Sequence, residues 1–352
     1  MHFPAQRWTA APAVEPTVDY DPRGLLDVVE HIGVPGHGPE DPLLDGEGGL
    51  VTGVDDGRIL RIDLELGTSV VLADTRGRPL GLEWLPDGDL LVCDAEVGLL
   101  RVPRAGGAVE VLTSHVGGQR LVLTNNAAVE DDGTIWFTES TRCNPLDDFV
   151  GDVLEHNGSG RLLRRDPDGD VHEVLSGLSF ANGVALVRDD EAGIDEVWVA
   201  ETAAYAIHRV QRSGPDAGAA RHVTDSLPGF PDNLAVGSDG TVWAPLPNPR
   251  NPIGDKVKQL AAPVRQLVRR IPDAITDRLV VPYARVLGFA PDGTVRHDLQ
   301  GTGEACRFLT GAREHDGHLY LGSVDEEVSS IVRVAVPAVP AAPVAAPTGD
   351  GA

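Results

Sequence analysis

Two pairs of adjacent polar residues stand where the chain is about to enter strand-forming segments. Asn125 and Asn126 lie near the start of "TNNAAVEDDGTIWFTES" (124–140), and Asp232 and Asn233 take a similar place in "FPDNLAV". Carboxamides and carboxylates are poor strand residues and are costly to bury without partners. Their oxygens are ligands for hard cations such as Ca²⁺, so metal binding is a hypothesis for both pairs.

A repeated turn-and-strand motif gives these pairs a common setting. Five segments contain an acidic residue, a glycine and then strand-forming residues, and a sixth, "DEVWVAETAAYAIHRV", is a degenerate copy. The five are "GEGGLVTGVDDGRILRID", "PDGDLLVCDAEVGLLRV", "DDGTIWFTES", "SDGTVWAPL" and "HDGHLYLGSVDEEVSSIVRV". Intervals of roughly 40–60 residues are typical of the four-stranded blades of a propeller. We therefore predict an all-β chain that forms a six-bladed β-propeller, in preference to a double β-sandwich, which rarely repeats one motif so often.

Alignment of the six copies on their turns defines one equivalent position, seven residues upstream of each acidic turn residue. In a propeller each innermost strand begins there, so the six side chains should face the central channel at one height. This position holds Glu40, Leu80, Asn125, Asn182, Asp232 and Leu309. The residue after it is Asp41, Gly81, Asn126, Gly183, Asn233 or Thr310.

Oxygen donors dominate the first of these two sets. Asn and Asp often precede strands because they hydrogen-bond local backbone, but turn formation does not require four of them at symmetry-related positions. Two carboxylates and two carboxamides around one axis suit Ca²⁺, which takes about six to eight oxygens. The same set of oxygens does not distinguish Ca²⁺ from other divalent cations. The lack of cysteine and histidine argues against zinc or copper. The predicted ligands are Glu40, Asn125, Asn182 and Asp232.

The second set adds candidates around this site. Asn233 is a candidate fifth ligand. Asp41 and Asn126 are candidates either for supporting hydrogen bonds to the ligands or for a second cation site deeper in the channel.

Composition excludes several classes of partner. The chain has 352 residues, 41% of them apolar, and a net charge of -25, which repels phosphate backbones and makes nucleic acid an unlikely partner. No apolar run reaches the roughly 18 residues of a membrane span, and the first residues lack the apolar core of a signal peptide. Three cysteines without a spaced framework suit reduced thiols. We expect a cytoplasmic protein.

The chain is expected to divide into three parts. Residues 1–32 form an N-terminal segment that partly closes the propeller, 33–334 form the propeller, and 335–352 form a disordered Pro/Ala-rich tail. An insertion at about 251–281, between the predicted fifth and sixth blades, contains apolar residues at helical spacing, with lysines and arginines mainly on other faces. It is predicted to be a basic amphipathic helix that is interrupted or bent at Pro263. Surface packing, a lid over the channel mouth and a membrane contact remain open for it, and the lid is favoured over the membrane contact.

Several segments between Gly33 and Val334 carry a family resemblance. They are "GPED", "GRPLGLEW", "GRLLRRDPDG", "FANGVAL", "FPDNLAV" and "REHDGHLYLGS". They resemble the calcium-dependent six-bladed propellers that include gluconolactonases of the senescence-marker-protein type, diisopropyl fluorophosphatase, paraoxonases and strictosidine-synthase-like proteins. The nearest branch is the strictosidine-synthase-like group with the adipocyte plasma membrane-associated protein, which has a similar basic segment after "WAPLPNPRNP". The resemblance implies calcium ligands at Glu40, Asn125, Asn182 and Asp232, and in paraoxonases also at the position of Asn233.

Two departures limit what the resemblance implies. Strictosidine synthases use a Glu where this chain has Thr310, so the acid/base group of their amine–aldehyde condensation is missing. Paraoxonases place a catalytic His where this chain has Leu80. His37 and His115 are the nearest histidines in sequence, and a lone loop histidine is more often a structural hydrogen-bonding residue.

These observations predict a calcium-dependent hydrolase of lactones or of aryl and alkyl esters. The ion would polarise the carbonyl, and Asp232 would orient or deprotonate water or attack directly. A cyclase or isomerase that uses the same ion, and a non-catalytic calcium-stabilised binding protein, remain as alternatives.

Overall fold

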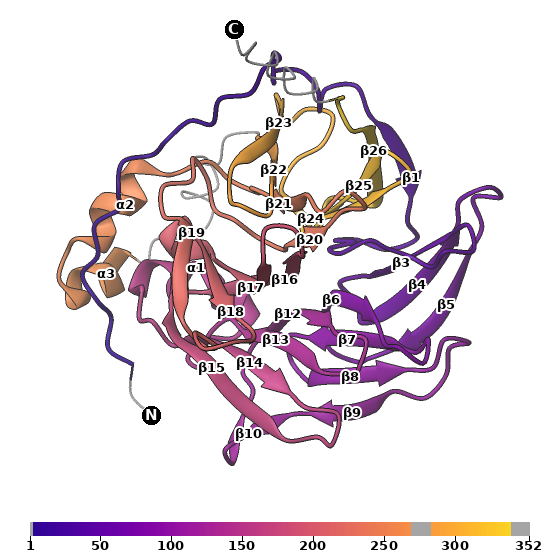
Figure 1. Ribbon diagram of the computed structural model, residues 1–352, viewed down its shortest axis with the longest axis horizontal. Helices are drawn as coiled ribbons and strands as arrows, with labels where there is room; N and C mark the ends of the chain where they lie inside the picture. Colours follow the sequence, from indigo (N-terminus) through magenta and orange to yellow (C-terminus); the bar gives the residue numbers. More distant parts are fainter. Residues whose placement is uncertain (1–2, 269–282, 339–352) are drawn as a thin grey trace, which may run out of the picture.

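A computed structural model describes residues 3–268 and 283–338 (Figure 1). In these residues, six antiparallel four-stranded sheets surround a central axis, which confirms the predicted six-bladed propeller. A two-stranded hairpin, β10 (His115–Val116) with β11 (Gln119–Arg120), projects between the second and third blades. The end of the predicted insertion and most of the predicted tail lie outside the described residues.

The first three blades follow one another in the chain, each running from its innermost to its outermost strand. Blade one comprises β2 (Leu43–Leu44), β3 (Gly49–Gly53), β4 (Arg58–Asp63) and β5 (Ser69–Asp74). Blade two comprises β6 (Pro79–Trp84), β7 (Leu90–Asp94), β8 (Gly98–Val102) and β9 (Glu110–Thr113). Blade three comprises β12 (Thr124–Val129), β13 (Ile135–Glu139), β14 (Gly160–Arg165) and β15 (Val171–Leu178).

The last three blades repeat this order, except that the final blade takes its outermost strand from the beginning of the chain. Blade four comprises β16 (Ala181–Asp189), β17 (Ile194–Glu201), β18 (Ala206–Gln211) and β19 (Ala220–Thr224). Blade five comprises β20 (Ala235–Val236), β21 (Val242–Pro245), β22 (Ala284–Phe289) and β23 (Val295–Gly301). Blade six comprises β24 (Leu309–His315), β25 (His318–Ser323), β26 (Ser330–Ala335) and β1 (Glu30–Gly33).

Pairing of β1 with β26 closes the ring. The register runs antiparallel from Glu30 opposite Arg333 to Gly33 opposite Ser330. A propeller closed in this way leaves no innermost sheet edge open to solvent, because every blade packs on two neighbours. The N-terminal segment ahead of β1 runs along the outside of the disc (Figure 1).

The hydrophobic core lies between blades. Leu43 and Val51 of blade one pack with Leu82 and Val92 of blade two in one buried cluster, and comparable clusters fill each of the other blade interfaces. The inner strands therefore present apolar residues to both faces of their sheets, which explains the near-continuous burial of strands such as β7.

All described helices lie in loops that join the second and third strands of a blade. Blade three carries the 3₁₀ helix η1 (Leu146–Asp148) and α1 (Phe149–Glu155), blade four carries η2 (Thr202–Ala204), and blade five carries α2 (Pro252–Lys258) and α3 (Ala262–Val268). Because consecutive strands are antiparallel, these loops reach the end of the propeller at which the innermost strands begin. No described helix is both long enough and apolar enough to span a bilayer.

The insertion differs from its prediction in two ways. It lies within blade five, between β21 and β22, rather than between the fifth and sixth blades, because β22 and β23 complete the sheet that β20 and β21 begin. Its described part forms two seven-residue helices separated by residues 259–261. Asn251 caps the first helix, accepting from the backbone amides of Ile253 and Gly254, and Pro263 lies in the first turn of the second. Its expected amphipathic pattern is also reversed. Lys258 and Arg265 are each 1% exposed, whereas four apolar residues of the insertion are at least 42% exposed. These are Ile253, Leu260, Val264 and Leu267.

Tertiary contacts explain this reversal. The Arg265 guanidinium donates to the backbone carbonyl oxygens of Gln6, Leu154 and Glu155, and so joins α3 to the N-terminal segment and to α1. In Figure 1, α2 and α3 lie toward the edge of the disc, outside blade four, rather than over the innermost strands.

Candidate functional site

The predicted ligand positions coincide with irregularities in the innermost strands. The pairing of β12 with β13 shifts between Thr124 and Ala127, so Asn125 and Asn126 fall in a bulge, and β16 has the same shift between Ala181 and Val184. A bulge leaves residues out of the ladder and re-aims their side chains. This is how two adjacent carboxamides can open a buried strand.

Close approach of neighbouring innermost strands brings these bulges together. A Cβ at Gly81 would lie 2.7 Å from the carbonyl oxygen of Asn125, and one at Gly183 would lie 2.2 Å from the backbone nitrogen of Leu234. Both positions therefore need glycine for steric reasons. The Gly183 amide donates to the Asp232 carbonyl oxygen over 3.2 Å, which ties blade four to the loop before β20.

Four buried oxygens in this region have no hydrogen-bond partner among the described residues. They are Glu40 Oε2, Asn125 Oδ1, Asn182 Oδ1 and Asn233 Oδ1. Buried hydrogen-bond acceptors are rarely left without a partner. Here four such acceptors come from different blades, while no side-chain donor of the same four residues lacks a partner. This pattern fits a bound cation better than a packing defect. Glu40, Asn125, Asn182 and Asn233 are each at most 4% exposed, whereas Asp232 is partly exposed.

Hydrogen bonds fix which atoms of these side chains stay free. Asn233 Nδ2 donates to Glu40 Oε1 over 2.8 Å, and Asn125 Nδ2 donates to Ser140 Oγ over 3.0 Å. The amide nitrogens are thus held away from the free oxygens. Ser140 is fully buried and was not singled out from the sequence, because a serine after a strand carries no signal of its own.

The two carboxylates repel each other when no cation is bound. Burial raises the pKa of Glu40 well above its usual value, and the charges of Asp41 and Asp232 raise it further. Burial also raises the pKa of Asp232 to about 7, despite hydrogen bonds from the Asn182 side chain and the Asn233 backbone that lower it. A divalent cation would offset both effects because it stabilises the ionised forms.

Asp41 and Asn126 already use their oxygens inside the protein. Asp41 Oδ2 accepts from the Leu82 amide over 3.0 Å and from Arg313 over 3.1 Å, and Asn126 Oδ1 accepts from the Val184 amide over 2.8 Å. None of these partners is a predicted ligand, so the two side chains tie neighbouring innermost strands together, and a role for them around the cation stays a prediction.

The other residues named from the sequence do not add an acid/base group to the site. Leu80 and Thr310 are buried, and Thr310 Oγ1 donates to the backbone carbonyl oxygen of Glu40 over 3.2 Å. His37 and His115 are exposed, and His115 Nδ1 lies 3.0 Å from Ser114 Oγ on the projecting hairpin.

The wall next to the site is apolar. Leu80, at the height of the ligands, packs with Leu123 and Phe180 in a buried cluster, and Leu146 and Val153 of the η1–α1 segment pack against it. The Phe180 backbone has a φ of 64°, a conformation rarely adopted by residues other than glycine, and it lies two residues before Asn182. The η1–α1 segment, rather than α2 or α3, therefore adjoins the channel mouth.

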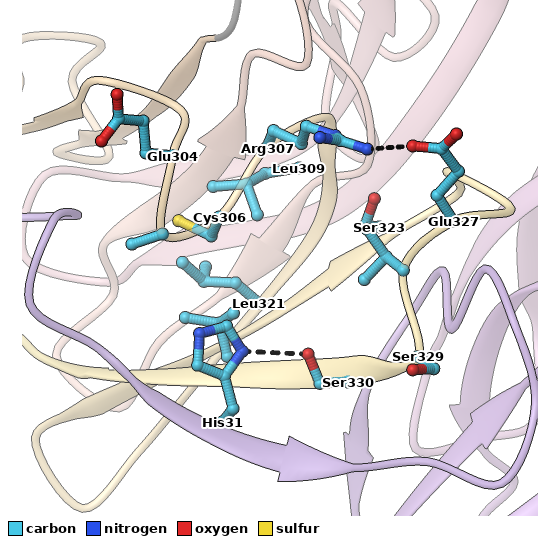
Figure 2. A pocket seen from close by; sticks show the side chains of 13 residues that line it. His31, Glu304, Cys306, Arg307, Leu309, Leu321, Ser323, Glu327, Ser329 and Ser330 are labelled. Atoms are coloured by element: carbon cyan, nitrogen blue, oxygen red, sulfur yellow. Dashed lines mark hydrogen bonds and ion pairs between the residues drawn. The ribbon is translucent and has the colours of Figure 1, made fainter.

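A separate cavity of about 270 Å³ lies against blade six (Figure 2). None of the predicted ligands lines it. Its His31 Nδ1 lies 3.0 Å from Ser330 Oγ, and its Arg307 pairs with Glu327. Burial raises the pKa of the Cys306 thiol to about 12, so this cysteine is not a thiolate nucleophile near neutral pH. The cavity offers no reactive group comparable to the channel site.

A family model described as "SMP-30/Gluconolactonase/LRE-like region" matches residues 39–271. The chain belongs to this family. It is similar to the adipocyte plasma membrane-associated protein of Salmo salar, with 33% identity over 78% of this chain and 70% of that protein. It is also similar to strictosidine synthase-like 10 of Arabidopsis thaliana, with 35% identity over 82% of this chain and 83% of that protein. The predicted family resemblance is thereby confirmed.

Solved structures share the fold at low sequence identity. A gluconolactonase from Xanthomonas campestris aligns with a TM-score of 0.62 and 18% identity, over 94% of this chain and all of that one. A calcium-binding protein, regucalcin, from Agrobacterium tumefaciens aligns with a TM-score of 0.57 and 13% identity, over 86% of this chain and 94% of that one. These similarities show the propeller fold of the family.

Proposed function

We propose that the protein is a calcium-dependent hydrolase of lactones or of aryl and alkyl esters. The observation that carries the proposal is the set of four unpartnered buried oxygens from Glu40, Asn125, Asn182 and Asn233, together with the neighbouring residue Asp232, which is partly exposed. The similarity to a gluconolactonase supports the hydrolase activity, and the similarity to a calcium-binding protein supports the metal.

The residues divide into ligands and a reactive group. The four unpartnered oxygens would hold the ion with Asp232, and the charges of Glu40 and Asp232 together balance a divalent cation. Bound Ca²⁺ would polarise the substrate carbonyl and stabilise the negative charge that develops on its oxygen.

Asp232 is the residue best placed to act on the substrate. It is the predicted ligand with partial solvent access, and its backbone is fixed by a hydrogen bond of 3.1 Å from its amide to the Pro245 carbonyl oxygen. Its carboxylate can orient an attacking water and accept the proton of that water, or can attack the carbonyl carbon directly. The apolar residues around Leu80 would exclude competing water from the substrate.

A biosynthetic condensation is the second candidate, because one relative is named as strictosidine synthase-like. Such a reaction needs a carboxylate to move protons during ring closure. The equivalent position is Thr310, whose hydroxyl hydrogen-bonds to the Glu40 backbone and cannot serve as an acid or base near neutral pH. A binding protein without catalytic activity is the third candidate.

A substrate panel distinguishes the three candidates. We expect hydrolysis of phenyl acetate or of a simple lactone that is lost on chelation, and no condensation of tryptamine with an aldehyde. Calcium binding with ester and lactone hydrolysis only at the uncatalysed rate would favour the binding protein, and condensation activity would favour the biosynthetic enzyme.

A further inference from the structure

We infer that Lys258 is a positioning residue for the loop that carries Asp232 and Asn233, and that the helical insertion acts as a brace for this loop. The inference rests on the proposed function, because it concerns how the proposed ligands are held. It assigns a role to the insertion other than that of a lid or a membrane contact.

The surroundings of Lys258 are those of a caged cation. Its side chain is 1% exposed, and Nζ donates to the Ala203 carbonyl oxygen over 2.8 Å. Nζ lies 4.9 Å from the ring centroid of Trp8, 4.8 Å from that of Tyr205 and 5.6 Å from that of Phe230. Aromatic faces attract cations, so the three rings compensate in part for the loss of water around the ammonium group.

The cage joins segments that are far apart in the chain. Trp8 belongs to the N-terminal segment. Its backbone amide donates to the Lys258 carbonyl oxygen over 3.2 Å. Ala203 and Tyr205 belong to the η2 loop of blade four, and Phe230 belongs to the loop before β20. Lys258 is therefore a common contact of α2, the N-terminal segment and two loops on the side of the propeller where the ligands lie.

Two short connections run from this cage to the ligand loop. Thr202, next to Ala203, donates from Oγ1 to the Pro231 carbonyl oxygen over 2.7 Å. Phe230 lies only two residues before Asp232 and packs edge-to-face on Tyr205, with ring centroids 4.7 Å apart. A shift of either contact would move the backbone at Asp232, and the Asp232 carboxylate would move with it.

The backbone at Tyr205 indicates that the cage holds a strained geometry. Its φ is 58°, in the left-handed region that aromatic residues rarely occupy. The Tyr205 hydroxyl donates to Asp255 Oδ1 over 2.7 Å, so α2 fixes this residue at both its ring face and its hydroxyl. Strained conformations of this kind persist only when surrounding contacts hold them.

The sign of the effect on calcium affinity separates positioning from electrostatics. Removing a positive charge near a cation site would by itself strengthen calcium binding, since like charges repel. If Lys258 positions the ligand loop, its removal weakens calcium binding instead. A loss of affinity therefore cannot come from the change in charge alone.

The test is a calorimetric titration of chelator-stripped full-length protein with calcium chloride. In Lys258→Met, which keeps the length and shape of the side chain, we expect calcium binding to weaken about tenfold, the lower end of the range for residues that support metal ligands. Lys258→Arg, which keeps a cation in the cage, should recover most of the affinity. Lys256→Met is the matched control, because Lys256 is exposed on the same helix, and it should bind calcium as the wild type does.

A second variant covers the case in which Lys258→Met does not fold. Thr202→Val removes the hydroxyl that donates to Pro231 and keeps the shape of the side chain, and it should weaken calcium binding several-fold. Unchanged or tighter binding in folded Lys258→Met, or unchanged binding in Thr202→Val when the first variant does not fold, would overturn the inference while leaving the proposed function intact. A wild-type protein that binds no calcium would overturn both.

Discussion

The side-chain amide of Asn233 donates a hydrogen bond of 2.8 Å to Oε1 of Glu40, a residue 193 positions earlier in the chain. This bond joins the loop before blade five to the loop before blade one. It leaves Asn233 Oδ1 and Glu40 Oε2 as buried oxygens without a partner among the described residues. The two predicted ligands thus orient each other, and the predictions below follow from that arrangement.

Replacing Glu40 by Gln should separate calcium binding from folding. Glu40 is buried near the negative charges of Asp41 and Asp232, so Glu40→Gln removes repulsion from the calcium-free protein and should not lower its stability. In the wild type, calcium at about 100 times its dissociation constant should add roughly 2.7 kcal/mol to the free energy of unfolding. Thermal or urea unfolding with calcium and with chelator should show this gain in the wild type and little of it in the variant. An equal gain in both proteins would remove Glu40 from the ligand set.

Two adjacent asparagines should give opposite phenotypes. Asn125→Ala removes a free oxygen, so calcium binding and hydrolysis should be lost while the calcium-free protein stays folded. Asn126→Ala instead leaves the buried Val184 amide without an acceptor and should lower the free energy of unfolding by about 1–3 kcal/mol. Calcium titration and urea unfolding of both variants would test this. Equal calcium affinity in the wild type and Asn125→Ala would contradict the ligand assignment.

Arg313 should be essential for stability rather than for metal binding. It pairs with Asp41, whose side chain is 1% exposed, and with Glu83. Removing one partner of a buried ion pair leaves an uncompensated charge, so Arg313→Met should cost about 3–5 kcal/mol in urea unfolding of the calcium-free protein. Arg333→Met is the control, because Arg333 pairs with Glu30 at the surface of the same blade, and such pairs contribute at most about 1 kcal/mol. Similar losses in both variants would mean that the Asp41 pair has no special role.

The buried Lys258 should give the protein a stability that rises with pH above neutrality. Burial lowers the pKa of Lys258 to about 8, and Arg250 lowers it further, while Asp255 and Glu201 oppose the shift. The unfolded chain, with an ordinary lysine pKa of about 10.4, binds more protons than the folded chain between these values. The free energy of unfolding of the wild type should therefore rise relative to that of Lys258→Met by roughly 1–3 kcal/mol from pH 7 to pH 10.5. A difference between the two proteins that stays constant with pH would show that Lys258 titrates normally.

The architecture could be predicted from sequence because its signals are local and repeated. Acidic residue–glycine turns such as Asp87–Gly88 recur between the first and second strands of the blades, where glycine supplies the positive φ that the turn requires. The same repetition located Glu40, Asn125, Asn182 and Asp232, since residues at one offset from equivalent turns must lie at one height in a propeller.

The parts that could not be predicted depend on contacts between distant segments. Helical spacing placed the lysines and arginines of the insertion mainly on faces other than the apolar one, but Lys258 is buried because Trp8, Tyr205 and Phe230 supply a cage from three other segments. The support of Asn125 by Ser140 arises likewise from a bulge that strand periodicity does not reveal. Which of Asn125 and Asn126 has a free oxygen follows only from the packing of neighbouring strands.

The most direct test of calcium-dependent hydrolysis is the initial rate of phenyl acetate hydrolysis as a function of free calcium, measured on chelator-stripped protein with Asp232→Ala as the inactive reference. We predict a saturable rise whose midpoint matches the calcium dissociation constant from calorimetry, reversal of that rise by chelator, and no rise in Asp232→Ala. A wild-type rate that stays at the uncatalysed level over the whole calcium range, or that is high and indifferent to chelation, would contradict the account.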